Sequence, residues 1–221
     1  MKVNEKVNLI DSIENINSPD SSYFKILKKF SYDKNSFVRS RCAALLINFE
    51  TAESLKILLR LSNDKDAFVR TEAYDSLGIF YFPEVEKTLF RAINLEKDCL
   101  AKQYSILSWA DVVSQLHDDF KENIIFVQNI IDNNQTEDYD SCHIRLSCYY
   151  ALKLFGCDVI NNIFDFLNSE EYTVRCSALN LLNDVADDAN RELIRSAVVE
   201  LLKTEKNVAV KCEAEKVLNE L

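Results

Sequence analysis

One spacing of hydrophobic and small residues recurs six times along the chain. An aliphatic residue is followed at once by a basic residue, then by a small residue four places on and a large apolar residue eight places on. The first two copies lie within SFVRSRCAALL, residues 36–46, and AFVRTEAYDSL, residues 67–77. Positions four residues apart share one face of an α-helix, so each copy predicts a helix with one buried face. The copies begin at Val38, Val69, Ala101, Ile144, Val174 and Val210.

A second amphipathic segment precedes each copy of the motif. Examples are SYFKILKKF, residues 22–30, and PEVEKTLFRAI, residues 83–93. Pro83 suits the first turn of a helix, where its missing N–H costs little. One helix pair cannot bury its apolar face alone, whereas stacked pairs share a continuous core. The pattern therefore predicts an all-α fold, an α-solenoid of about six helix pairs.

An acidic residue lies five or six positions before the basic residue of every copy. Near the start of a helix, a carboxylate can accept backbone N–H groups and oppose the helix dipole. It can also pair with the basic residue of an adjacent repeat. This arrangement favours a structural role for the basic residues over a phosphate-binding stripe. The acids are Asp33, Asp64, Glu96, Asp140, Glu170 and Glu205.

These strings resemble HEAT repeats, in particular the short bacterial form that is also found in phycobilisome-lyase-like proteins. The resemblance covers about residues 20–221. It implies a right-handed α-solenoid in a single domain, residues 1–221, with an N-terminal capping helix over residues 1–19 and repeats over residues 20–221. It also implies that the motif helices line a concave face and that the acids and arginines form a ladder between repeats. The third copy departs from the pattern, with Lys102 in place of Arg and Trp109 in place of Leu.

Composition narrows the class of protein. Glycine and proline occur twice each, which disfavours sheets and tight hairpins. No apolar run reaches the length of about 18 residues that a membrane span requires, and the N-terminus does not read as a secretory signal. The seven cysteines include no CxxC pair, which is typical of reduced thiols. We therefore expect a cytoplasmic protein with no membrane partner.

Charge is uneven along the chain. Residues 1–110 hold 16 Lys and Arg against 15 Asp and Glu, a net charge of +1, whereas residues 111–221 hold 10 against 21, a net charge of −11. A negative surface repels phosphate backbones and attracts basic proteins. The sequence therefore predicts a basic protein partner for the C-terminal half and no nucleic acid.

Candidate chemistry is sparse, and we expect no catalytic residue, no metal and no cofactor. The spacing of Cys142, His143, Cys148 and Cys157 fits no zinc pattern. His117 stands before two aspartates that we expect to begin a helix. The longest irregular stretch is expected at residues 132–143, an exposed loop that lacks the glycine and the final Glu of a calcium loop.

The remaining candidates lie beside the buried stripe of the motif helices, at the third, sixth and tenth positions after the aliphatic residue. Tyrosines among acids suit protein recognition, although a solvated polar face has the same pattern. The predicted partner-binding residues are Glu72, Asp75, Tyr104, Asp111, Tyr150, Asn180 and Asp184, with Ser147 and Glu213 at equivalent positions.

Function is therefore expected to be non-catalytic. The sequence favours a protein–protein interaction module or scaffold, whose acidic C-terminal half docks a basic partner. One version is an immunity-type protein that neutralises a cationic nuclease toxin. The alternative is an enzyme, either a HEAT-like DNA glycosylase or a bilin-lyase-like protein. Trp109 and Asp111 invite the comparison with glycosylases, but Trp109 falls on a core position of the motif.

Overall fold

The structure is a computed structural model that describes residues 1–14 and 21–221. In these ranges the chain forms thirteen α-helices and two short 3₁₀ helices, and no β-strand, which confirms the predicted all-α class. Contacts divide it into two compact units, Met1–Asp118 (unit 1) and Asp119–Leu221 (unit 2). The single repeat domain stays a prediction. The predicted boundary between the capping helix and the repeats, at residues 19 and 20, lies outside the described residues.

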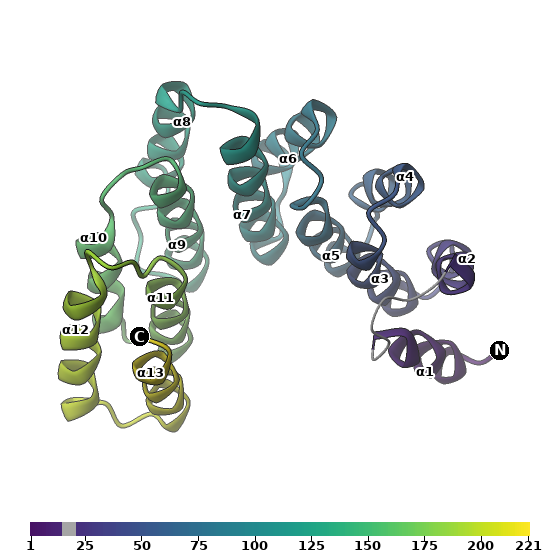
Figure 1. Cartoon of the computed structure of the whole chain (residues 1–221). Helices are drawn as coiled ribbons and strands as arrows, with labels where there is room; N and C mark the ends of the chain where they lie inside the picture. The colour runs from purple at the N-terminus through teal and green to yellow at the C-terminus, as the bar shows by residue number, and fades with distance from the viewer. Residues whose placement is uncertain (15–20) are drawn as a thin grey trace. The chain divides into compact units, whose positions relative to one another are not determined.

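Unit 1 consists of two layers of helices. In Figure 1, α1, α3, α5 and α7 follow one another in one layer, and α2, α4 and α6 pack against α3, α5 and α7. The motif helices thus form one layer and the segments that precede them form the other, as the pairing predicts. The elements are α1 (Val3–Glu14), α2 (Ser21–Phe30), α3 (Ser36–Leu45), the 3₁₀ helix η1 (Leu46–Asn48), α4 (Ala52–Leu61), α5 (Ala67–Leu77), α6 (Pro83–Leu95) and α7 (Cys99–Leu116).

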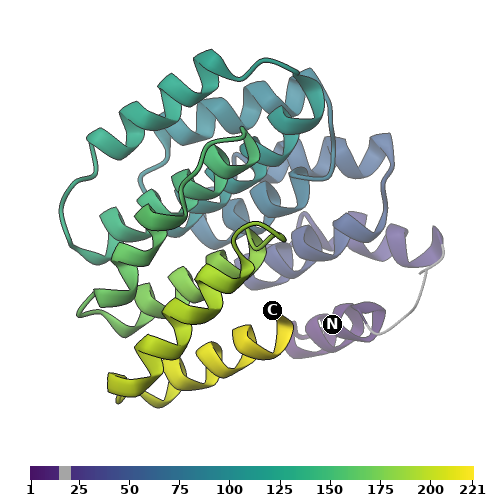
Figure 2. The same cartoon turned by 60° about the vertical axis from the view of Figure 1, so that its left-hand side comes forward.

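Unit 2 repeats this pairing. Within it, α9 packs on α11 and α11 on α13, while α8, α10 and α12 each pack on the motif helix that follows them. Figure 2 shows the last of these pairs, α12 and α13, at the yellow end of the chain. The elements are α8 (Lys121–Asp132), α9 (Tyr139–Leu154), α10 (Ile160–Asp165), the 3₁₀ helix η2 (Phe166–Asn168), α11 (Tyr172–Asp184), α12 (Arg191–Thr204) and α13 (Val208–Glu220).

The core confirms the register of the repeat. All six aliphatic residues that begin the motif are buried, and so are the six small residues four places on. The large residue eight places on is buried in five copies, whereas Leu218 in α13 is half-buried. The small residues are Cys42, Ala73, Ser105, Cys148, Ala178 and Ala214, and the five buried large residues are Leu46, Leu77, Trp109, Leu152 and Leu182.

Basic residues of one repeat pair with acids of the next. Arg39 in α3 donates from Nε and Nη2 to the two carboxylate oxygens of Asp64, over 2.7 and 2.6 Å. We call this series of pairs the ion-pair ladder. Its other members are Lys6 with Asp33, Arg70 with Glu96 (2.7 and 2.7 Å) and Arg175 with Glu205 (2.7 and 3.1 Å). The Lys6 pair extends the ladder to α1, which therefore takes the place of a motif helix.

Each ladder acid also holds the start of its own motif helix. Asp64 Oδ1 accepts the backbone N–H of Asp66 over 3.0 Å, and Asp66 is the residue that caps α5. Burial alone would raise the pKa of Asp64, but hydrogen bonds from Arg39 and from the Asp66 N–H outweigh burial, so the pKa is lowered. The two roles expected of the turn acids, accepting a backbone N–H and pairing with a basic residue, are thus both seen in Asp64, although the N-cap of α5 is Asp66.

The ladder changes at α9, which corrects two expectations. The irregular stretch was predicted at residues 132–143, but α9 already begins at Tyr139, because Asp138 caps it by accepting the Ser141 N–H over 3.0 Å. Asp140 therefore lies in the first turn of α9 and not in the preceding turn. Arg145 pairs over 2.8 Å with Glu137, whose side chain is 75% exposed, and not with an acid of the next repeat.

Candidate partner-binding site

Four predicted residues come together on two neighbouring helices of unit 1. Glu72 and Asp75 lie on α5, and Tyr104 and Asp111 lie on α7, which packs directly against α5. The negative charge of Asp111 raises the pKa of Asp75, and the charges of Asp75 and Glu72 raise the pKa of Tyr104. We call these four residues the α5–α7 cluster. It joins residues from two different repeats, as the shared register of the motif requires.

Burial weakens ionisation within the α5–α7 cluster. It raises the pKa of Glu72, and the neighbouring charge of Asp75 raises it further, while Arg41 opposes the shift. Burial also raises the pKa of Asp75, with a further contribution from Asp111. The Asp75 side chain is nevertheless exposed, so solvent and a partner can reach it. The cluster is therefore an accessible group of carboxylates whose ionised forms are made less favourable by burial and by the neighbouring negative charges.

The carboxylates of Glu72 and Asp75 receive no hydrogen bond and no ion pair from any residue that the structure describes. The nearest cation, Arg41 on α3, instead donates to Asp11 Oδ1 over 3.0 and 3.2 Å. A lysine or arginine from another protein would supply the charge and the N–H donors that these carboxylates lack.

Tyr104 adds a polar and aromatic group to the cluster. Burial raises the pKa of its phenol, and the charges of Asp75 and Glu72 raise it further. The phenol therefore stays protonated at neutral pH and can both donate and accept a hydrogen bond. Tyr104 is half-buried, and tyrosines are common anchors in protein interfaces, because the ring is large and rigid.

The predicted residues of unit 2 are less concentrated. Asn180 and Asp184 are exposed on α11, and Tyr150 is half-buried on α9. Burial raises the pKa of Asp184, but the positive charge of Lys216 on α13 opposes the shift. Lys216 also pairs with Glu213 over 3.1 Å. In unit 2 the acids of this surface therefore already have a cation of their own.

Ser147 corrects the predicted surface. It was expected beside Tyr150 on the exposed side of its helix, but it is buried, and its hydroxyl donates to the His143 carbonyl over 3.1 Å. The neighbouring His143 is buried as well, with its Nδ1 2.8 Å from the Tyr139 carbonyl oxygen. The third position after the aliphatic motif residue is therefore buried in α9, where it is Ser147, but only half-buried in α5, where it is Glu72.

The other residues considered for catalysis or metal binding make structural contacts. Trp109 is only 2% exposed, with its ring centre 6.4 Å from that of Phe90, which confirms the packing interpretation. His117 ends α7, and its Nε2 lies 3.0 Å from the Glu86 carboxylate. The helix after it begins at Lys121, with Asp119 accepting the Lys121 N–H over 3.1 Å.

The described residues contain neither a metal-binding cluster nor a membrane-spanning helix. No three His, Cys, Asp or Glu side chains converge there as metal ligands, and the seven cysteines are free thiols. No helix in the described part of the chain is both long and apolar enough to span a bilayer.

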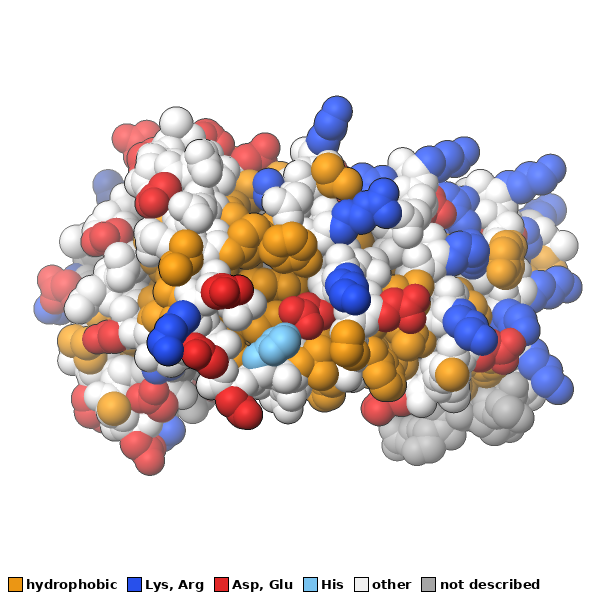
Figure 3. All heavy atoms as spheres, turned by 90° about the horizontal axis from the view of Figure 1, so that it is seen from above, with side chains coloured by type: hydrophobic (Ala, Val, Ile, Leu, Met, Phe, Trp, Pro, Cys, Tyr) orange, Lys and Arg blue, Asp and Glu red, His pale blue; other side chains and the backbone are white. Residues whose placement is uncertain are grey.

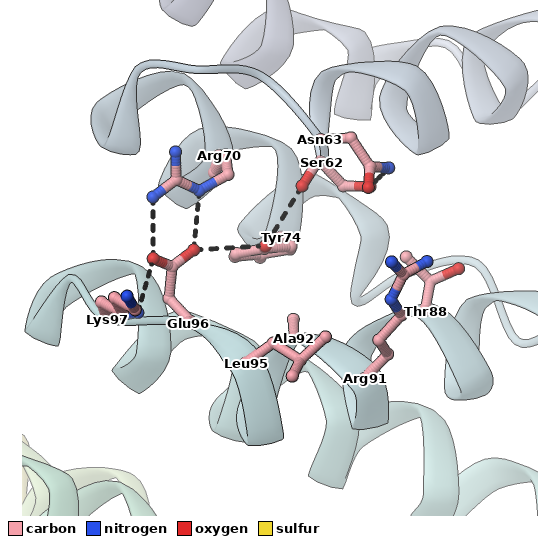
Figure 4. Close-up of a pocket in the computed structure, with 10 residues that line it drawn as sticks. All are labelled: Ser62, Asn63, Arg70, Tyr74, Thr88, Arg91, Ala92, Leu95, Glu96 and Lys97. Atoms are coloured by element: carbon pink, nitrogen blue, oxygen red, sulfur yellow. Dashed lines mark hydrogen bonds and ion pairs between the residues drawn. The ribbon is translucent and has the colours of Figure 1, made fainter.

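Two structural features near the candidate residues were missed by the sequence prediction. Arg41 occupies the third position after Val38, the same place as Glu72 and Tyr104 in their helices, so the repeat pattern contained this signal. The second feature is a pocket at the end of α6, shown in Figure 4, which contains Arg70 and Tyr74. It depends on differences between the helices α2, α4 and α6, which the predicted motif did not cover.

Comparisons with known proteins identify a fold only. No family model matches the chain, and no curated protein matches it in sequence. Among solved structures, the X-ray structure of YibA from Escherichia coli is similar, with a TM-score of 0.55 and 21% sequence identity. The match covers 99% of this chain and 76% of YibA. At this identity the likeness supports a shared helical fold and carries no information on activity.

Proposed function

We propose that this protein is a HEAT-repeat solenoid that works as a non-catalytic protein–protein interaction module. Three observations support the repeat assignment: six motifs with one buried register, the pairing of each motif helix with the helix before it, and the ion-pair ladder. Stacked helix pairs offer long surfaces that bind other macromolecules. The proposed role is to dock a positively charged protein.

The observation that carries this proposal is the α5–α7 cluster. Its carboxylates Glu72 and Asp75 have raised pKa values and no ion pair with any described residue. In the free protein neither carboxylate is therefore in an ion pair with a described residue, although the charge of Arg41 partly offsets that of Glu72. A basic side chain from a partner would stabilise their ionised forms, and Tyr104 would supply the adjoining aromatic contact.

The charge of unit 2 supports the same class of partner. Residues 119–221 hold 10 Lys and Arg against 19 Asp and Glu, a net charge of −9, whereas residues 1–118 hold 16 against 17, a net charge of −1. Such a field accelerates association with a basic protein and disfavours polyanions. We therefore keep the C-terminal half, with Asp184 and Asn180, as a second proposed docking surface, which belongs to unit 2 alone. Neutralisation of a cationic toxin is one form that this role could take.

The enzyme alternatives have less support. The comparison with DNA glycosylases was motivated by Trp109, but a side chain buried in the core of unit 1 cannot stack on a base. No observation on the described residues favours a bilin-lyase activity. The free thiols are consistent with a reducing compartment, so we propose a cytoplasmic protein.

A capture experiment with matched variants tests the proposal. The wild-type protein serves as bait in native lysate, beside a cluster variant that combines Glu72→Gln, Asp75→Asn and Asp111→Asn. The control variant combines Glu50→Gln, Glu84→Gln and Glu122→Gln, which removes the same charge from exposed acids elsewhere. We expect a basic protein that the wild type and the control retain and the cluster variant loses. Equal retention by all three baits, or retention of nucleic acid in place of a protein, would refute the proposal.

A further inference from the structure

A pocket of about 370 Å³ lies in unit 1 on the side of the helices that precede the motif helices. The ends of α4 and α6 form its walls, with Asn63 after α4 and with Leu95 and Lys97 at and after the end of α6. Figure 4 shows Arg91 and Lys97 on opposite sides of the pocket, with Ala92 and Leu95 between them. The pocket shares no residue with the α5–α7 cluster.

The preceding repeat shows what normally fills this place. The sequences of α4 and α6 align with an offset of 31 residues, which matches the buried Leu58 with the buried Leu89 and Arg60 with Arg91. Hydrogen bonds fix the side chain of Arg60, because its guanidinium donates to the Ser31 carbonyl and hydroxyl over 3.0 and 2.8 Å. It also lies 3.8 Å from the centre of the Tyr32 ring, a cation–π contact.

Arg91 has lost each of these partners. The carbonyl equivalent to that of Ser31 belongs to Ser62, and it accepts the hydroxyl of Tyr74 over 3.1 Å. The ring equivalent to Tyr32 is replaced by Asn63. Arg91 is therefore exposed and makes no hydrogen bond or ion pair with any described residue. Ala92, at the place of Leu61, leaves space beside it, so the groove that Arg60 closes is open at Arg91.

The charge on the pocket walls is positive. Its one carboxylate, Glu96, is engaged by Arg70 through both oxygens and also accepts the Lys97 backbone N–H over 2.9 Å. Arg91 and Lys97 have no such counter-charge among the described residues. Three cations thus face one carboxylate, which is already paired. An anionic group can pair with the remaining two cations, Arg91 and Lys97.

The walls also indicate which anion fits. Both α4 and α6 end at the pocket, and the C-terminal ends of helices carry carbonyl groups and negative dipole potential. That potential disfavours a compact, doubly charged phosphate more than the singly charged carboxylates of a peptide, which can be divided between Arg91 and Lys97. The surface between Arg91 and Lys97 is apolar, with Leu95 63% exposed. A peptide with an apolar side chain flanked by carboxylates meets all three features.

We propose that this pocket binds an acidic peptide segment of another protein, with carboxylates on Arg91 and Lys97 and an apolar side chain over Ala92 and Leu95. The surrounding surface would attract such a segment. Figure 3 shows Lys and Arg side chains gathered over the N-terminal helices, on the right of the view. Four exposed lysines of α2, α4 and α6 have no ion pair with a described residue: Lys25, Lys29, Lys56 and Lys87. The site is separate from the proposed docking of a basic protein and has the opposite charge preference.

An amide NMR titration of the full chain tests the proposal. The probe is an N-acetylated Glu-Leu-Glu-Leu-Glu peptide, and the comparison probes are Lys-Leu-Lys-Leu-Lys, inorganic phosphate and a short DNA duplex. We expect the acidic peptide alone to shift the amide signals of Asn63, Leu95 and Lys97. Arg91→Glu is expected to weaken its affinity about tenfold, because a charge-assisted hydrogen-bonding partner is replaced by a repelling charge.

Lys87→Glu is the matched control, since it makes the same charge change on an exposed residue of the same helix, one turn from Arg91 and outside the pocket. It should weaken binding less than about twofold, through long-range charge alone. Equal weakening by the two variants would overturn the proposal. So would phosphate or DNA shifting the same signals while the acidic peptide does not, or self-association of the chain that Arg91→Glu abolishes.

Discussion

Arg39 and Asp64 are joined by two hydrogen bonds, of 2.7 and 2.6 Å, across two successive helix pairs. Their side chains are only 8% and 10% exposed. Arg39 Nη1 also donates to the Asp33 carbonyl over 2.9 Å, so one guanidinium links two turns of the chain. A pair that is nearly buried costs much more to break on one side than an exposed pair does, because the remaining charge stays desolvated.

The first prediction follows from this burial. Asp64→Ala should lower the free energy of unfolding by about 3–5 kcal/mol, since it leaves Arg39 buried without its acid. Glu200→Ala, which breaks the Lys203–Glu200 pair whose two side chains are exposed, should cost less than about 1 kcal/mol. Urea unfolding followed by circular dichroism measures both. Similar losses for the two variants would show that the ladder is not a distinct stabilising element.

A second prediction concerns the large residue of the motif. Leu77 and Leu182 have no exposed surface, so Leu77→Ala or Leu182→Ala should cost about 2–5 kcal/mol of unfolding free energy. Leu218→Ala provides the comparison, because Leu218 occupies the same motif position but is half-buried. Its loss should be clearly smaller in the same unfolding assay. A neutral Leu77→Ala would mean that the repeat register is misassigned.

The third prediction is a loss of stability in acid. Burial would raise the pKa values of Asp64, Glu96 and Glu205, but hydrogen bonds from their arginine partners and from backbone N–H groups, together with the arginine charges, outweigh burial and lower them. A carboxyl with a lowered pKa in the folded state stabilises the fold above its unfolded-state pKa, near about 4. That contribution is lost as the pH falls through the folded-state pKa. The urea concentration at the midpoint of unfolding, measured from pH 7 to pH 3, should decrease once the pH is below about 4. This decrease should be smaller in Asp64→Asn.

The α5–α7 cluster predicts the opposite pH dependence, a contribution to stability that is lost as the pH rises. The pKa values of Glu72 and Asp75 are raised in the folded protein, mainly by burial. Such groups stabilise the fold when protonated and lose that contribution as the pH rises through the folded-state pKa. At pH 7 the variants Glu72→Gln and Asp75→Asn should therefore have a higher Tm than the wild type. A lower Tm for both would indicate that these carboxylates serve the fold and not a partner.

The motif itself explains how much of the fold could be predicted. Val38, Cys42 and Leu46 recur at fixed spacing because each helix must bury the same face, so layers and register followed from the sequence. The start of α9 was misplaced because Asp138 caps the helix through a local network with Thr136 and Ser141 that no repeat spacing encodes.

The candidate site was predictable only in part. Glu72, Asp75, Tyr104 and Asp111 were found because they share a side of the motif helices. The pocket at Arg91 was not found, because it arises where Tyr74 occupies the Ser62 carbonyl and Asn63 stands in the place of Tyr32. Such a feature depends on the contacts between helices and not on the spacing of apolar residues.

The central claim, that the α5–α7 cluster docks a basic protein, is tested most directly by site-specific photocrosslinking. The substitution Tyr104→p-benzoylphenylalanine places the photoreactive group within the cluster, and Tyr81→p-benzoylphenylalanine places it at an exposed tyrosine of unit 1 outside the cluster. After irradiation in cells, we predict a discrete crosslink at Tyr104 to a basic protein, which Asp75→Lys abolishes, and no such product at Tyr81. Identical products at both positions, or a Tyr104 crosslink that Asp75→Lys leaves unchanged, would contradict the account.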